Sequence, residues 1–279
     1  MGTTTPGTIK APQISVCMPV YNGAWCLGAA LESVLTQTFQ DFEILIFDDA
    51  STDGTWGVLE SVQDPRVRCH RNPRNIGAEA NWNQCLQAAT GTYIKIFHQD
   101  DKMAPDCLKR QLDCLELDPR RVLAFCRRSI IDSDGRRLGS RGAPWKEGEV
   151  EGSAVARGCV LRGTNLVGEP SAVLFRARAA REAGFFDGSI PYLIDLDYWV
   201  RILVYGPGYY LDDPLVSFRV SNRQWSVALG NRQTDDFIRF IDRIAGRGIY
   251  RPSIAARAWA RWMARMNGWA RAAFYMLFC

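Results

Sequence analysis

Two apolar runs of this 279-residue chain each end near a pair of carboxylates, and this feature constrains the fold most strongly. Residues 44–47 (Ile-Leu-Ile-Phe) precede Asp48-Asp49, and residues 93–97 (Tyr-Ile-Lys-Ile-Phe) are followed, after two residues, by Asp100-Asp101. Such runs predict buried strands of a parallel sheet, and ligands of open α/β sheets lie beyond the carboxyl ends of the strands. Carboxylates gathered there repel one another and resist desolvation, so we expect a divalent cation or a polyol beside them.

The first half of the chain alternates strands with helices. We expect strands over 14–20, 42–47, 66–70, 92–97 and 122–126, and helices over 25–36, 55–62, 78–89 and 105–117. This alternation predicts a mostly parallel, Rossmann-like sheet flanked by helices. After residue 128 we expect a hairpin turn at 132–135, a loop over 140–152, a strand over 173–176, and helices over 178–183 and 195–204.

Composition narrows the class of protein. A hydrophobic content of 47% and a charged content of 23% are typical of a globular chain. The nine cysteines show no CxxC spacing and no signal peptide precedes them, so we expect reduced thiols in a cytoplasmic protein. Only two histidines are present, so we expect no zinc site, and no apolar run is long enough to span a bilayer.

Short motifs follow the predicted strands in a fixed order. They are Pro19-Val20-Tyr21-Asn22, the stretch DDASTDG over 48–54, Asn75-Ile76-Gly77 and Asp100-Asp101. In this order the motifs resemble those of glycosyltransferase family 2, and the likeness covers about residues 15–226. The resemblance implies the GT-A fold, in which a nucleotide-sugar-binding α/β sheet is followed by an acceptor-binding region.

The resemblance also assigns roles to single residues. It implies that Asp49 accepts a hydrogen bond from the base, that Asp100 binds ribose, and that Asp101 binds Mn²⁺ or Mg²⁺ bridging the diphosphate. The remaining residues that would border the nucleotide are Pro19, Val20, Tyr21, Asn22, Asn75 and Gly77. A structural alternative is that the acidic pairs cap loops or helices, and that Asn75 and Gly77 only shape a turn. We expect His98 to be a packed or indirectly supporting residue rather than a ligand.

The second half carries a motif for the catalytic base. Residues 194–201 read Ile-Asp-Leu-Asp-Tyr-Trp-Val-Arg. They resemble the family motif Glu-Asp-x-Asp-x-Trp-x-Arg, whose first Asp is the base, and this implies that Asp195 is the base here. Ile194 replaces the leading Glu, and Ser221 stands where the family has a metal-holding His. The alternative for Asp195 is a helix N-cap.

Two further carboxylates are candidates for the acceptor side. Glu169, in Gly168-Glu169-Pro170-Ser171, would either orient the acceptor or cap a strand end. Asp197 lies about 200° from Asp195 on a helix and cannot share its role, so we expect it to hold a neighbouring element, in an ion pair with Arg201.

The C-terminal segment is strongly basic. From Arg243 to Cys279 it contains seven arginines and no Asp, Glu or Lys, within a chain of net charge +4. On a helical wheel the arginines from residue 257 onward share one face, and Trp259, Trp262 and Trp269 lie opposite. This pattern predicts an amphipathic helix on a membrane surface. The alternative is a helix that packs its tryptophans on the catalytic domain; nucleic acid is not an expected partner, because the basic patch is local.

Together these features predict a donor-binding half over 13–128, an acceptor and catalytic-base half of the same domain over 129–230, and a helical appendage over 231–279. The predicted activity is metal-assisted, inverting transfer of a single hexosyl or deoxyhexosyl unit. The donor would be a UDP- or dTDP-sugar, and the acceptor a hydroxyl of a glycan or lipid-linked glycan at the inner face of the cytoplasmic membrane. Gln224-Trp225 lacks the Arg-Trp of processive synthases, which favours single addition.

Three alternatives compete with this prediction. A polyprenyl-phosphate glycosyltransferase would need no strong base, because its acceptor is already an anion. A non-catalytic nucleotide-sugar-binding or membrane-scaffold protein would explain Ile194 and Ser221. A nucleotidyltransferase is disfavoured, since no Gly-rich phosphate loop follows the first strand.

Overall fold

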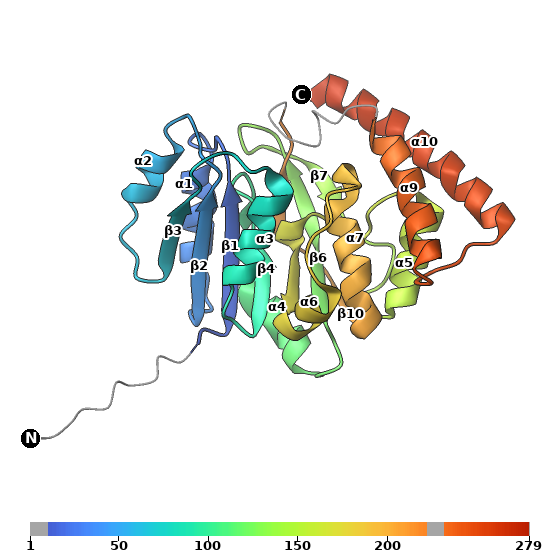
Figure 1. Cartoon of the computed structure of the whole chain (residues 1–279), viewed down its shortest axis with the longest axis horizontal. Coiled ribbons are helices and arrows are strands. Elements are labelled where there is room, and N and C mark those ends of the chain that lie inside the picture. Colours follow the sequence, from blue (N-terminus) through green and yellow to red (C-terminus); the bar gives the residue numbers. More distant parts are fainter. Residues whose placement is uncertain (1–10, 222–231, 279) are drawn as a thin grey trace, which may run out of the picture.

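The strands of the protein form one mixed sheet. The computed structural model describes residues 11–221 and 232–278, with side chains up to residue 273. Within this part ten strands pair, eight of them in the order β3-β2-β1-β4-β9-β6-β10-β5, with β7 beside β6 and β8 beside β10 (Figure 1). The order turns at β1, which lies between β2 and β4, and such a switch point is where α/β sheets bind ligands.

The first half of the chain folds as its pattern predicts. Its elements are β1 (Ile14–Val20), α1 (Leu27–Leu35), β2 (Phe42–Asp48), α2 (Thr55–Glu60), β3 (Val67–Arg71), α3 (Ala78–Ala88), β4 (Tyr93–Ile96), β5 (Lys102–Met103) and α4 (Cys107–Glu116). The strands β3, β2, β1 and β4 are all parallel. Every residue of β1 and β2 is buried, because helices cover both faces of the sheet.

The second half adds antiparallel neighbours. Its elements are β6 (Leu123–Ile131), β7 (Arg137–Arg141), β8 (Gly148–Val150), α5 (Gly152–Arg162), β9 (Val173–Arg176), α6 (Ala177–Ala183), α7 (Ile194–Ile202), β10 (Gly208–Arg219), α9 (Arg232–Gly246) and α10 (Ile254–Phe278). Strand β9 runs antiparallel to both β4 and β6, while β10 is parallel to β6. One sheet therefore contains both predicted halves, and the boundary at residue 128 falls inside β6.

Several elements of this half differ from prediction. The segment 140–152 is not all loop, because β7 ends in it and β8 lies in it. Strand β6 continues five residues beyond Cys126, since Arg127 and Arg128 interrupt the apolar run but find acidic partners. Strand β10 is absent from the predicted elements: its Asp212-Asp213-Pro214 stretch breaks the strand pattern and coincides with irregular pairing to β6. Helix α5 carries too weak an apolar stripe to be recognised.

The last two helices belong to the same core as the sheet. Phe237, Phe240 and Ile244 of α9 are fully buried in the core that also contains Phe175 of β9. Helix α10 lies along α9 and α5 (Figure 1). Within the part of the chain that the structure describes, no helix combines the length and apolar content needed to cross a membrane.

Candidate active site

The loops that follow β1, β2 and β4 are fastened to one another at the carboxyl edge of the sheet. The backbone N–H of Tyr21 donates to Oε1 of Gln99 at 2.8 Å, and Nε2 of Gln99 donates to the Tyr21 carbonyl at 2.9 Å. Oδ1 of Asn22 accepts from the N–H of Thr52 at 2.9 Å. The structure therefore brings the predicted 19–22 and 48–54 motifs together, with Tyr21 46% exposed above them.

Asp49 holds the loop that carries Asn75 and Gly77. Its carboxylate is 3% exposed and accepts from Nδ2 of Asn72 and from the N–H groups of Ile76 and Gly77, each at 2.9 Å. Gly77 has φ of +88°, a conformation that favours glycine, and its N–H also meets Oδ1 of Asn75 at 3.1 Å. A carboxylate offers about four acceptor positions, so one remains for a ligand.

His98, Asp100 and Asp101 form a cluster at the end of β4. Their ligand atoms lie within 4.8 Å of one another. Asp101 is fully buried, and its Oδ1 accepts from the N–H of Arg219 at 3.1 Å. The guanidinium of Arg219 ties the cluster to the hairpin after β6, because it donates to the carbonyls of Asp100 and Ser133 at 2.9 and 2.7 Å.

Two atoms of this cluster are buried without a hydrogen-bond partner among the described residues: Oδ2 of Asp101 and Nε2 of His98. Burial first, and the charge of Asp100 second, raise the pKa of Asp101 well above its usual range. Burial lowers the pKa of His98, which keeps its ring neutral and able to bind a metal. Buried polar atoms without partners are costly, so this donor set fits a divalent cation. The ring of His98 also packs against Trp82, with centroids 5.0 Å apart, in agreement with the expectation that His98 is a packed residue.

Asp195 lies in the first turn of α7. Oδ2 accepts from Nδ2 of Asn165 at 3.0 Å, and Oδ1 accepts from the N–H of Leu196 at 2.7 Å. The helix begins at Ile194, with Leu193 at the N-cap position, so the alternative that Asp195 is an N-cap is wrong. Burial first, and the charge of Glu169 second, raise the pKa of Asp195 to about 7. A carboxyl group with this pKa can exchange a proton near neutral pH.

Glu169 pairs with a buried arginine. Its Oε2 lies 2.6 Å from Nε of Arg128, whose side chain is 1% exposed. Burial opposes ionisation of Glu169, but the charges of Arg128 and Arg141 together outweigh it and lower the pKa of Glu169. The charge of Glu169 acts both on Asp195 and on the Asp101 cluster. Glu169 therefore belongs to the candidate site, where it forms an ion pair with Arg128.

Asp197 is a structural residue. It is fully buried, and its Oδ2 pairs with Nε of Arg201 at 2.9 Å, which confirms the predicted ion pair. Its Oδ1 pairs with Arg247 of the segment after α9, also at 2.9 Å. With both oxygens paired and no exposed surface, Asp197 cannot meet an acceptor, and its candidacy for the acceptor side is wrong. Its role is to hold α9 against α7.

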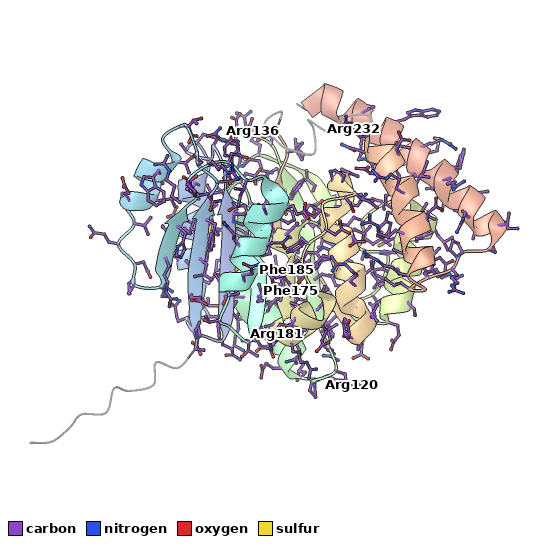
Figure 2. All side chains as sticks on the ribbon, in the orientation of Figure 1. Arg120, Arg136, Phe175, Arg181, Phe185 and Arg232 are labelled. Atoms are coloured by element: carbon purple, nitrogen blue, oxygen red, sulfur yellow. The ribbon has the colours of Figure 1, made fainter. Side chains whose placement is uncertain are left out.

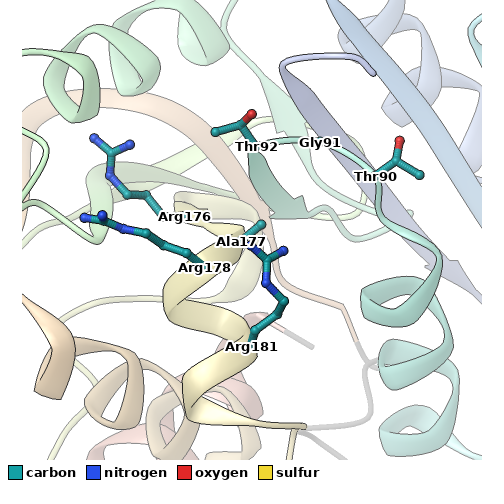
Figure 3. Close-up of a pocket in the computed structure, with 7 residues that line it drawn as sticks. All are labelled: Thr90, Gly91, Thr92, Arg176, Ala177, Arg178 and Arg181. Atoms are coloured by element: carbon teal, nitrogen blue, oxygen red, sulfur yellow. The ribbon is translucent and has the colours of Figure 1, made fainter. Parts of the chain in front are cut away.

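A separate cavity lies at the opposite edge of the sheet. It has a volume of about 230 Å³ and is lined by Arg176, Arg178 and Arg181 and by the 90–92 segment before β4 (Figure 3). In Figure 2, Arg181 lies in the lower part of the molecule, while Arg136, in the hairpin between β6 and β7, lies at the top. The arginine cavity is therefore remote from the carboxylates and is not part of the candidate site.

Sequence reasoning missed several residues that shape the site. Asn165 follows the unpredicted helix α5, and Arg128 lies in the part of β6 beyond its predicted end. Gln99 directly precedes the Asp100-Asp101 motif, but no sequence pattern would reveal its bonds to Tyr21. Ser221 is buried, with its Oγ lacking a described partner. Gln224-Trp225 lies outside the described residues.

Known proteins resemble the chain in sequence and in fold. A family model described as glycosyl transferase family 2 matches residues 15–183. An uncharacterized protein of Mycobacterium tuberculosis is 33% identical over 201 residues, which cover 69% of this chain and 62% of that protein. A protein of Escherichia coli named UDP-Glc:alpha-D-GlcNAc-diphosphoundecaprenol beta-1,3-glucosyltransferase is 33% identical over 105 residues, 38% of this chain and 42% of that protein.

A solved structure supports the fold. The mannosyltransferase of Pyrobaculum calidifontis, in complex with GDP-Man and Mn²⁺, superposes with a TM-score of 0.65 at 19% identity. The match covers 95% of this chain and 76% of the mannosyltransferase. At this identity the likeness concerns the fold, and it confirms the α/β architecture predicted from the motifs.

Proposed function

Because the chain belongs to glycosyltransferase family 2 and has the GT-A fold, we propose that it is a metal-assisted, inverting enzyme that moves one sugar from a nucleoside diphosphate donor to a hydroxyl. One observation carries this proposal: the candidate site combines Asp195, whose carboxylate accepts from Asn165 and whose pKa is raised by burial to about 7, with the cluster of His98, Asp100 and Asp101, whose ligand atoms lie within 4.8 Å of one another. An inverting transferase needs a base that takes the proton of the acceptor and a site that stabilises the leaving group.

The chemistry assigned to Asp195 is proton removal. As the acceptor oxygen attacks C1 of the sugar, Asp195 takes the hydroxyl proton. The bond from C1 to the diphosphate oxygen breaks, its electron pair leaves with the diphosphate, and the configuration at C1 inverts. Asn165 orients the carboxylate, and Glu169 maintains its proton affinity by its charge.

The donor side is assigned to the loops after β1, β2 and β4. Asp49 would offer its remaining acceptor position to the base, and Asp100 would bind ribose. The other predicted nucleotide contacts, from Pro19, Val20, Tyr21, Asn22, Asn75 and Gly77, surround the same edge. UDP or dTDP is the proposed nucleotide, and the E. coli relative is named for UDP-Glc.

Asp101 and His98 would hold Mn²⁺ or Mg²⁺, with Asp100 beside them. A divalent cation bound there would neutralise charge that grows on the departing diphosphate. The imidazole nitrogen of His98 favours Mn²⁺ over Mg²⁺, which prefers oxygen ligands alone.

The proposed acceptor is a hydroxyl of a glycan or lipid-linked glycan. The E. coli relative is named for an acceptor on diphosphoundecaprenol, which supports this class. A lipid-linked acceptor would place the enzyme, a cytoplasmic protein, at the inner face of the cytoplasmic membrane. The rival acceptor, a polyprenyl phosphate, gains no support from Asp195, because an anionic acceptor has no proton for it to remove.

Calorimetric titration tests the donor site. UDP, dTDP, GDP and CMP are each titrated with and without Mn²⁺ into the wild type, Asp101→Ala, and the matched control Asp134→Asn, an exposed carboxylate on the hairpin after β6. We expect Mn²⁺-dependent binding of one nucleoside diphosphate by the wild type and the control, and its loss in Asp101→Ala. Failure of the wild type to bind any of them would refute the donor assignment.

Turnover separates the enzyme from its non-catalytic rival. Release of the nucleoside diphosphate from the matching donor sugar is followed with a glycan or lipid-linked acceptor mixture. Tight donor binding with neither transfer nor slow donor hydrolysis would favour a nucleotide-sugar-binding protein instead.

A further inference from the structure

Helix α10 exposes a stripe of large apolar side chains. Trp259, Trp262, Met266 and Trp269 are 52%, 48%, 39% and 70% exposed. Their spacing of three and four residues places them along one face of the helix, and the rings of Trp259 and Trp262 lie 5.0 Å apart. Large aromatic side chains rarely gather on a free surface without a partner. We call these four residues the tryptophan stripe.

The opposite face of α10 packs against the domain through small residues. Ala260 and Ala264 are fully buried. The helix approaches α5 so closely that a Cβ at Gly163 would lie 2.6 Å from the backbone nitrogen of Ala264. Gly268 has the same tight contact with Thr234 of α9. This close packing fixes the rotation of α10, so the tryptophan stripe faces outward because small residues occupy the inner face.

The arginines of α10 are mostly used to hold the helix. Arg257 and Arg261 both pair with Asp242 of α9, at 3.5 and 3.2 Å. Arg271 donates to Oε1 of Gln233 at 2.9 Å. Three of the four arginines predicted to lie opposite the tryptophans therefore contact the domain. The alternative in which the tryptophans pack on the domain is wrong for Trp262 and Trp269, while Trp259 donates its ring N–H to the carbonyl of Leu161 at 3.0 Å.

The chemistry of the free face identifies its partner. Tryptophan is the side chain that best suits the boundary between lipid headgroups and acyl chains, because its ring is apolar and its N–H is polar. The whole segment from Arg243 onward has no Asp, Glu or Lys, so an anionic surface meets no repulsion there. Arg265, beside the stripe, is exposed and has no ion pair within the described part of the chain.

The position of α10 relates the stripe to the active site. In Figure 1 the helix runs along the outside of the molecule, and its C-terminal end lies toward the edge of the sheet where β1, β2 and β4 end. A surface contacted by the outer face of α10 would thus pass beside the carboxylate edge. This is the edge that a membrane-bound acceptor has to reach.

We propose that the tryptophan stripe docks the enzyme on the surface of an anionic phospholipid bilayer, with α10 lying in the headgroup region. Membrane binding itself does not depend on the proposed function. Only its purpose, which is to bring Asp195 to a lipid-linked acceptor, rests on that function. Attachment comes mainly from the tryptophans, because three of the four arginines of α10 already bind residues of α9. Binding should therefore depend strongly on Trp262 and Trp269 and less on ionic strength than binding by a basic helix would.

Vesicle co-sedimentation of the full chain tests this proposal without donor or acceptor. The vesicles contain phosphatidylcholine alone or with phosphatidylglycerol. We expect the wild type to bind the anionic vesicles. In the double variant Trp262→Ala/Trp269→Ala, each substitution should lower the vesicle affinity by at least about tenfold. Arg265→Gln should weaken binding only about fivefold. The matched control is Leu117→Ala, a comparably exposed apolar residue at the end of α4, and it should bind as the wild type does.

Several outcomes would overturn the proposal. One is a wild type that binds no vesicles, and another is a double variant that binds as well as Leu117→Ala. A third is a tryptophan-dependent dimer in sedimentation velocity without vesicle binding, which would make a second copy the partner. Trp269→Ala alone, at the most exposed position, repeats the test with the smallest change to α10. Vesicle binding without sugar transfer would keep the docking proposal and refute the proposed function.

Discussion

Replacing Asp195 by asparagine should have opposite effects on activity and on stability. The carboxylate accepts from Asn165 and from the N–H of Leu196, and an asparagine side chain of nearly the same shape can keep the first of these bonds by its oxygen. What it cannot do is accept a proton from the acceptor hydroxyl. We therefore expect kcat/KM to fall by roughly a hundredfold to ten-thousandfold, which is the range for loss of a general base.

The stability effect follows from the pKa. The ordinary pKa of an aspartate side chain is 3.8, and burial together with the charge of Glu169 raises the pKa of Asp195 to about 7 in the folded protein. The folded state thus binds the proton more tightly, and this contribution to stability is complete below pH ~4 and is lost as the pH rises to ~7. Each pKa unit corresponds to about 1.4 kcal/mol, and the contribution lost between pH 5 and pH 8 is close to two such units. Allowing for partial exposure of the side chain, we estimate about 2 kcal/mol.

The assay compares urea unfolding of the wild type and Asp195→Asn at pH 5 and pH 8. The variant has no charge to bury at this position. The difference in unfolding free energy, variant minus wild type, should therefore be about 2 kcal/mol larger at pH 8 than at pH 5. The exposed control Asp134→Asn should differ from the wild type by no more than about 0.5 kcal/mol at either pH. In parallel, kcat/KM of the wild type should rise with pH through an apparent pKa of about 7.

Two results would refute this reasoning separately. A stability difference that is the same at both pH values would show that Asp195 does not carry a raised pKa. A variant that keeps its rate within about threefold would show that Asp195 is not the base, since losing a base costs far more. The second result would favour a polyprenyl-phosphate acceptor.

Other variants test the rest of the site. His98→Gln should weaken Mn²⁺ binding about tenfold or more, measured by paramagnetic resonance of free Mn²⁺, and should affect Mg²⁺ less; equal losses for both ions would remove His98 from the ligand set. Asp197→Asn should cost about 3 kcal/mol in urea unfolding, because it removes the charge of a fully buried carboxylate that pairs with Arg201 and Arg247, whereas the exposed Asp242→Asn should cost less than about 1 kcal/mol; similar costs would contradict the buried network. Asp49→Asn should speed hydrogen exchange of the Ile76 and Gly77 amides, which lose a charged acceptor, and unchanged exchange would show that another group holds this loop.

The acidic edge of the sheet is predictable from the amino-acid sequence. Continuous apolar runs that form strands alternate with helices of period 3.6, and parallel strands end at a common edge, so Asp49 and Asp101 had to lie at the same edge of the sheet. The prediction failed where local pattern is weak. Strand β10 contains a proline and two aspartates, and it is held in the sheet by pairing with β6. No local signal records such a partner, because pairing is a property of residues far apart in the chain.

The amino-acid sequence alone thus determined the α/β architecture, the order of the carboxylate motifs and the ion pair from Asp197 to Arg201, because each depends on neighbours along one strand or helix. Only the tertiary structure decided how Glu169 meets Arg128, how Asn165 meets Asp195, and which face of α10 is free. The helical wheel separated Arg257, Arg261 and Arg271 from the tryptophans correctly, whereas Arg265 lies exposed beside them. Which of the two faces inward depended on small residues and on Asp242 of another helix, and a single helix cannot contain that information.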